Sequence, residues 1–62
     1  MIHPTRHDLG RKVITRDYRK TDDGMVGDWI EGRIDGFDKM AVAVEFLDGS
    51  RVLNRVDLEW VA

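Results

Sequence analysis

The stretch from Trp29 to Val52 alternates apolar and polar side chains in two runs that meet at a polar turn. The second run, residues 40–47, places Val42, Val44 and Phe46 on one face. This period of two is typical of a half-buried β-strand. Because polar turns separate successive runs, the pattern predicts a meander of antiparallel strands.

The first run, residues 28–36, predicts a strand with Ile30 and Ile34 on one face and Gly32 between them. A glycine inside a strand indicates a bulge, a bend, or another backbone passing close to it. After the second run, the Asp48-Gly49 pair is of the kind that two-residue hairpin turns favour. It predicts a tight turn into the next strand.

The remaining elements flank these two runs. Residues 11–18 alternate β-forming side chains and predict the first strand. Residues 19–27 are dense in Asp, Gly and Thr and are too long for a tight hairpin turn, which predicts an open loop. The expected elements after the Asp48-Gly49 turn are a strand at 51–54, one helical turn at 55–57 and a last strand at 58–61.

Residues 1–10 form an expected N-terminal arm, and residues 11–62 the main domain. Pro4 and Gly10 suit the start and the end of a short helical turn over residues 5–9, with Leu9 as its apolar anchor. A loose arm without this turn is the alternative. The predicted interior comprises Val13, Ile30, Ile34, Val42, Val44, Phe46, Val52 and Leu58.

Composition narrows the class of protein. A chain of 62 residues forms one domain with a small core. It has no cysteine, which excludes disulfides and thiolate metal sites. It also has no apolar run near the length that spans a membrane and no signal segment, so we expect a cytoplasmic protein without membrane contact.

This order of strands, loop, tight turns and late helical turn resembles the SH3-like barrels, and among them the Tudor-like barrels. The stretches that carry the resemblance are 10–13 (G-R-K-V), 29–34 (W-I-E-G-R-I), 42–49 (V-A-V-E-F-L-D-G) and 56–60 (V-D-L-E-W). The resemblance implies an all-β, five-stranded SH3-like barrel with one short helical turn before the last strand. The N-terminal I-H-P and the C-terminal D-L-E-W are similar to small uncharacterised phage and prophage proteins, which implies a phage or bacterial origin.

A resemblance to an enzyme family is also visible and is incomplete. The run W-x-x-G-x-I-x-G at residues 29–36 is similar to the plasmid-borne type II dihydrofolate reductases, whose active pore depends on a V-Q-I-Y stretch. The comparable residues 51–54 read R-V-L-N and lack both the Gln and the Tyr. We therefore expect no enzymatic activity, no catalytic residue and no cofactor.

Metal binding is not expected either. His3 and His7 are four residues apart, but Pro4 interrupts a helix there and Asp8 is the only further ligand nearby. A zinc site needs at least three good protein ligands. The Asp-Gly pairs lack the order of acidic residues that a calcium loop requires, so they are interpreted as turns.

The exposed aromatic side chains and the long loop predict a protein-binding site. Its expected residues are Tyr18, Arg19, Trp29 and Phe37, together with the loop at 19–27. Aromatic residues and Arg are enriched at the centres of interfaces. Through the Tudor-like resemblance, these aromatics could instead form a cage for a methylated cation. Simple packing on the core is the third interpretation, and it is the one expected for Phe46 and Trp60.

The alternative function is weak nucleic-acid binding through the first strand and loop. Residues 1–20 carry six Lys or Arg side chains against two acidic ones, whereas residues 21–62 carry four against ten. The candidate phosphate-binding residues are Arg11, Lys12, Arg16, Arg19 and Lys20. Acidic residues at 17, 22, 23 and 28 lie in the same region and would repel phosphate. The expected state is a monomer or a homodimer, because a small core gains from covering an edge strand.

Overall fold

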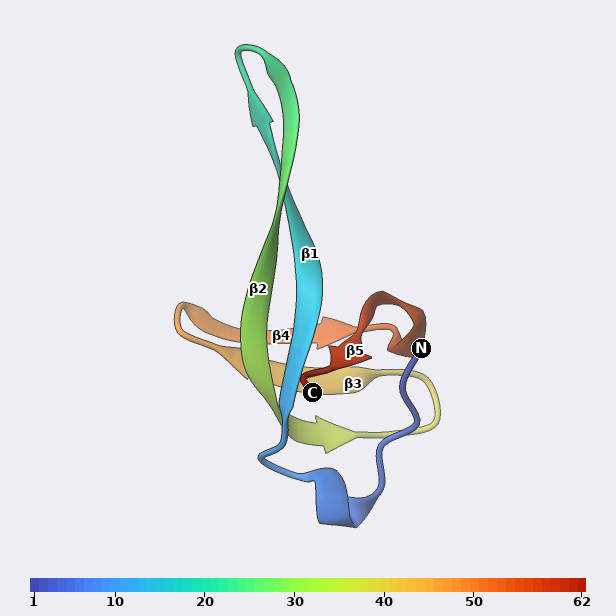
Figure 1. Ribbon diagram of the computed structural model, residues 1–62. Helices are drawn as coiled ribbons and strands as arrows, with labels where there is room; N and C mark the ends of the chain where they lie inside the picture. Colours follow the sequence, from blue (N-terminus) through green and yellow to red (C-terminus); the bar gives the residue numbers. More distant parts are fainter.

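The computed structural model describes residues 1–62 and contains one sheet of five antiparallel strands (Figure 1). The strands are β1 (Lys12–Thr21), β2 (Gly24–Phe37), β3 (Val42–Phe46), β4 (Gly49–Leu53) and β5 (Glu59–Trp60). Two 3₁₀ turns, η1 (Arg6–Asp8) and η2 (Arg55–Asp57), complete the elements. The predicted all-β class, the five strands and the helical turn before the last strand are confirmed, and of the two alternatives for residues 1–10 the structure has the short turn.

The strand order is β4-β3-β2-β1-β5, so β4 and β5 are the two edges of an open sheet. No strand pairing joins these edges, and the barrel that the SH3-like resemblance implies is therefore not closed by hydrogen bonds. The sheet nevertheless curls. The guanidinium of Arg51 on β4 lies 3.4 Å from the Asp17 carboxylate on β1 and 5.2 Å from the centre of the Phe46 ring.

The predicted open loop at residues 19–27 is wrong. β1 and β2 pair continuously from Lys12 opposite Arg33 to Thr21 opposite Gly24, leaving only two residues, 22 and 23, in the turn. Gly24 adopts a φ of 124°, which L side chains rarely adopt, and the Thr21 hydroxyl donates to its carbonyl. The Asp- and Gly-rich composition thus marks the turn alone, and the strands continue through its flanks.

The outer half of this hairpin projects beyond the rest of the molecule (Figure 1). We call residues 16–29 the arm. The projection gives the chain its elongated dimensions of 41 × 22 × 21 Å. The second hairpin, between β3 and β4, is also displaced by one residue from its prediction, because Leu47 and Asp48 form the turn and Gly49 begins β4 with a φ of 131°.

Gly32 marks the place where β3 passes close to β2. A Cβ at Gly32 would lie 2.6 Å from Val44 Cγ1 and 2.8 Å from the Glu45 carbonyl oxygen. Of the three interpretations of this glycine, close approach of another backbone is therefore the correct one. The bulge in β2 falls later, between Ile34 and Gly36, where the register with β3 shifts.

The core lies between the curled strands. Its buried side chains are Ile2, Val13, Ile34, Val42, Val44, Phe46 and Leu58, with Ile30, Leu53 and Trp60 packed against them. Two predictions need correction. Val52 is 72% exposed because it pairs with Ala43 on the outer face of the sheet. Leu9 is exposed, and Ile2 anchors the N-terminal segment instead, with its N–H donating to the Arg55 carbonyl.

Candidate functional site

An open groove of about 390 Å³ lies at the base of the arm. Thr15, Arg16, Tyr18 and Trp29 of the hairpin line one side, and Leu53, Val56, Asp57 and Glu59 line the other. We call this the arm groove. It brings together Tyr18 and Trp29, two of the four residues that the sequence predicts for protein binding.

Both aromatic side chains are ordered by their cross-strand neighbours. Tyr18 is opposite Gly27, and its ring lies so close that a Cβ on Gly27 would be 2.8 Å from Tyr18 Cε1. Trp29 is opposite Arg16, whose guanidinium lies 4.4 Å from the indole centre and also donates to the Gly27 carbonyl at 3.2 Å. Tyr18 is 63% exposed and Trp29 49% exposed. The two rings are thus held in place and are still accessible to a ligand.

The other side of the groove comes from the segment that follows β4. The Thr15 hydroxyl donates to the Asp57 carbonyl at 2.6 Å, which fixes η2 against β1. Leu58 is fully buried, so the neighbouring Asp57 and Glu59 lie outward and give the groove an acidic rim. Alternation around Leu58 predicts this outward orientation, but no pattern in the sequence indicates that the arm lies opposite.

The other two predicted protein-binding residues lie elsewhere. Arg19 is opposite Val26 on the reverse face of the arm, where its guanidinium contacts the Asp28 carboxylate at 2.7 Å. Phe37 ends β2 opposite Val42 and is 37% exposed. Neither lines the groove. The structure therefore does not gather Tyr18, Trp29 and Phe37 into one aromatic cage.

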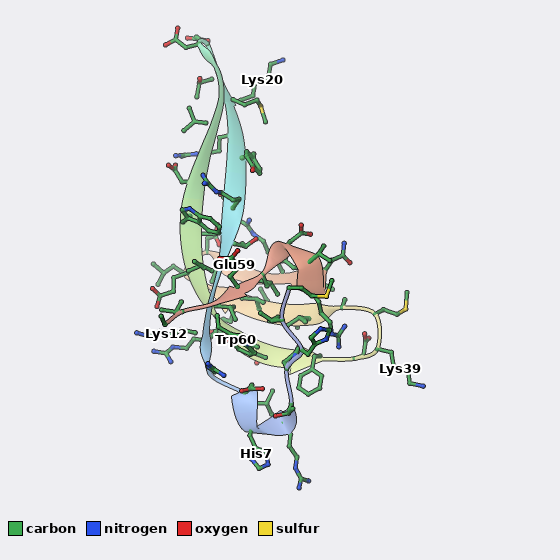
Figure 2. All side chains as sticks on the ribbon, turned by 45° about the vertical axis from the view of Figure 1, so that its right-hand side comes forward. His7, Lys12, Lys20, Lys39, Glu59 and Trp60 are labelled. Atoms are coloured by element: carbon green, nitrogen blue, oxygen red, sulfur yellow. The ribbon has the colours of Figure 1, made fainter.

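The five candidate phosphate-binding residues do not form one free basic surface. Arg11 stacks on Trp60 at 4.1 Å and contacts Asp8, and Lys12 lies 3.5 Å from Glu31. Arg16 and Arg19 have the partners described above. Lys12 and Lys20 lie far apart along β1, with Lys12 near Trp60 at the base and Lys20 in the arm (Figure 2). Most of the positive charge is thus paired within the chain.

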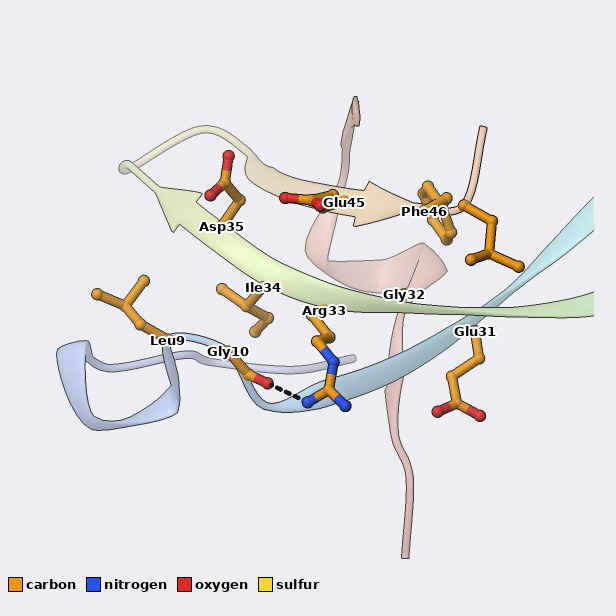
Figure 3. Close-up of a pocket in the computed structure, with 10 residues that line it drawn as sticks. Leu9, Gly10, Glu31, Gly32, Arg33, Ile34, Asp35, Glu45 and Phe46 are labelled. Carbon is orange, nitrogen blue, oxygen red and sulfur yellow. Dashed lines mark hydrogen bonds between the residues drawn. The ribbon is translucent and has the colours of Figure 1, made fainter. Parts of the chain in front are cut away.

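A second hollow is lined by residues of β2, of β3 and of the segment before β1 (Figure 3). Its lining residues are Leu9, Gly10, Glu31, Gly32, Arg33, Ile34, Asp35, Glu45, Phe46 and Leu47. Arg33 is opposite Glu45 in the sheet and donates to the Gly10 carbonyl at 3.0 Å. Of the acidic side chains here, Glu31 pairs with Lys12 of β1 at 3.5 Å. The hollow contains none of the residues that the sequence predicts for binding.

Two carboxyl groups outside the arm groove have a lowered pKa. The Thr5 N–H donates to Asp8 and lowers its pKa, with Arg11 adding to the effect. The pKa of Asp38 is lowered by hydrogen bonds from the Ala41 and Met40 amides. His3 and His7 are exposed, and no three His, Cys, Asp or Glu side chains gather closely enough to hold a metal ion. No helix has the length and apolar character to cross a membrane.

Comparisons of the chain with protein-family models, with curated proteins and with solved structures find no match. The functional argument consequently depends on the chain's own geometry. Within that geometry, the arm groove combines two ordered aromatic rings, two aliphatic side chains and an acidic rim.

Proposed function

We propose that this protein is a non-enzymatic binding module of SH3-like, Tudor-like architecture that captures a protein partner in the arm groove. One observation carries the proposal. Tyr18 and Trp29 come from different strands to line the same groove, and neither belongs to the buried core. A 62-residue chain gains little stability from two large rings left this exposed.

The SH3-like part of the proposal is supported by the arrangement of the elements. Four strands follow one another as a meander, β5 returns to pair with β1, and a 3₁₀ turn precedes β5. The contact between Arg51 and Asp17 draws β4 toward β1 across the core. This curl is what a small barrel requires, although fold alone specifies no ligand.

The groove's chemistry supports a proposal for the kind of partner. Exposed Trp and Tyr rings supply large contact areas at a low cost in conformational entropy. Arg16 holds the indole of Trp29 before any ligand arrives, so less ordering is required on binding. The carboxylates of Asp57 and Glu59 at the rim favour a peptide that places a Lys or Arg next to an apolar residue.

The test uses peptides selected on the wild-type protein from a random displayed library. Trp29→Ala should weaken their binding at least about tenfold in calorimetry, since a central aromatic residue contributes more than about 1.4 kcal/mol. The thermal unfolding midpoint should stay unchanged because Trp29 lies outside the core. Val52→Ala, which trims an exposed apolar side chain on β4, is the matched control and should bind normally.

Loss of folding in Trp29→Ala would show that the indole is structural and would overturn the site. Unchanged peptide affinity in a folded Trp29→Ala variant would overturn it as well. A parallel titration with single-stranded DNA addresses the alternative. Binding that falls steeply with salt would favour phosphate recognition over the arm groove.

A further inference from the structure

The outer edge of β2 is unpaired over most of the arm. β1 pairs with β2 from Gly24 to Arg33, but β3 pairs with β2 only from Arg33 onward. Residues 24–32 therefore have a strand on one side and none on the other. Unpaired edges of this length are templates for further strand pairing.

The register shows which backbone groups of β2 point away from β1. The Val61 N–H donates to the Lys12 carbonyl on the β5 side of β1, so even-numbered residues of β1 direct their backbone groups away from β2. Their odd-numbered neighbours bond to the even-numbered residues of β2. The N–H and C=O groups of Met25, Gly27, Trp29 and Glu31 consequently point outward. The Gly27 carbonyl accepts from the Arg16 guanidinium at 3.2 Å, which agrees with this direction. Pairing at Gly27 therefore requires the exposed Arg16 side chain to share this carbonyl, which has two lone pairs, or to leave it.

The same segment has exposed apolar side chains, and its edge is protected only by the charges of Asp28 and Glu31 and by the Arg16 guanidinium on the Gly27 carbonyl. Met25 is 66% exposed, Val26 43% and Trp29 49%. Natural proteins usually protect a free edge with Lys, with Pro or with a covering element. Residues 24–32 contain neither Lys nor Pro, and a two-stranded hairpin alone is at best marginally stable.

We propose that this edge of β2 pairs with the same edge of a second copy of the chain, antiparallel and centred on Gly27. The two arms then form one continuous four-stranded ribbon. In this register Met25 lies opposite the partner's Trp29, and Val26 lies opposite the partner's Asp28. The central glycines let the two backbones meet without displacing the Tyr18 rings that cover them.

Charge selects this register over its neighbours. Centring the pair on Asp28 would place two carboxylates directly opposite each other, which destabilises a sheet. Centring it on Val26 would leave only the tip of the arm paired. In the Gly27 register no like charges face each other over residues 24–30, and the one such pair, Asp23 opposite the partner's Glu31, lies at the ribbon's ends.

The buried area predicts a weak dimer. Met25, Val26 and Trp29 together can cover on the order of 300 Å² per copy, so the total stays below the size of a standard interface. The dimer covers part of Trp29, which also lines the arm groove, so dimer and bound peptide share this side chain. The two proposals are separated by their tests, because a backbone substitution at Gly27 leaves both aromatic rings of the groove in place.

Sedimentation of the full chain tests the association. The average mass should rise from 7.2 kDa toward twice that value as the concentration increases from about 10 µM to about 1 mM. Gly27→sarcosine, made by chemical synthesis, removes the central outward N–H without adding a Cβ. It should raise the concentration at which half of the chains are dimeric by at least about tenfold. Val52→Ser on the free edge of β4 is the control and should associate like the parent.

Single cysteine substitutions can report which residues of the two β2 strands lie opposite each other, because the natural chain contains no cysteine. Val26→Cys and Asp28→Cys, mixed in a redox buffer, should form mainly the mixed disulfide, well above the statistical half. A monomer at all concentrations overturns the dimer. A sarcosine variant that associates normally, or homodisulfides in excess, overturns β2 pairing in this register. Unchanged unfolding of the dilute sarcosine variant confirms that the monomer itself is intact.

Discussion

Gly32 has no room for a side chain, because β3 passes directly above it. The nearest atoms to a Cβ there belong to Val44, to the Glu45 backbone and to the Phe46 ring. Two of these residues are part of the core, so any displacement spreads into the packing between the strands. This position therefore couples one backbone contact to the stability of the whole chain.

Gly32→Ala should lower the free energy of unfolding by about 1–3 kcal/mol, as expected when atoms are forced into a packed site. Gly36→Ala is the matched control, because no atom lies within 4 Å of a Cβ at Gly36. Urea denaturation of both variants measures the difference. Equal losses in the two would show that the crowding at Gly32 is relieved without cost.

The arginines show where prediction from individual residues reaches its limit. The exposure of Tyr18 and Trp29 follows from their positions near the ends of apolar runs, and the structure agrees. The partners of Arg11 and Arg16 depend on which residue lies opposite or nearby in space. A basic cluster in the sequence thus becomes two separate cation–π pairs, one on Trp60 and one on Trp29.

The turn between β2 and β3 depends on one carboxylate. Asp38 accepts hydrogen bonds from the Met40 N–H at 2.7 Å and from the Ala41 N–H at 2.8 Å. Its own N–H donates to the Ala41 carbonyl, and the side chain of Arg55, the first residue of η2, donates to its carbonyl. The charged form of Asp38 is favoured in the folded chain, which is why its pKa is lowered.

Acid should therefore weaken the folded state through this turn. A lowered folded-state pKa contributes stability above the unfolded value, near 3.8, and this contribution disappears as the pH falls through the folded value. Asp38→Asn keeps an acceptor for both amides but cannot titrate, so its stability should depend less on pH below about 4. Urea denaturation across this range compares the two proteins. If the free energy of unfolding changes with pH equally in the two proteins, Asp38 does not contribute to the loss of stability in acid.

The elements were predictable in kind but not in extent. Alternating apolar residues identify the strands, and Asn54 is followed by the expected single turn at residues 55–57. The length of the β1–β2 hairpin was missed, because the polar residues at 19–23 are compatible with a loop as well as with an exposed ladder. Only the cross-strand register distinguishes the two. The same ambiguity explains Val52, whose outward direction is set by its pairing with Ala43.

The molecule as a whole consists of a body that contains the entire core and an arm that contains none of it. No core residue falls within residues 16–29, whereas both 3₁₀ turns and all the buried apolar side chains belong to the body. Figure 1 shows the arm extending away from the other strands. Arm amides should therefore exchange with solvent by local opening, while amides of β3 require much larger openings.

Shortening the arm separates its two proposed roles. Deleting the cross-strand pairs Arg19/Val26 and Lys20/Met25 removes two residues from each strand, which keeps every remaining side chain on its present face. Tyr18 stays opposite Gly27, and Thr21 and Gly24 still close the turn. The arm groove should survive, whereas most of the free apolar edge is lost.

The shortened chain should unfold within about 1 kcal/mol of the parent, because the deleted residues contact no core side chain. It should bind the selected peptides normally in calorimetry and sediment as a monomer at every concentration tested. Loss of peptide binding in the folded, shortened chain would move the binding surface from the groove to the tip. Persistent dimerisation would overturn pairing through Met25 and Val26 and would place the self-pairing edge on β4, on β5 or on the part of β1 beyond Ile14, which β5 does not cover.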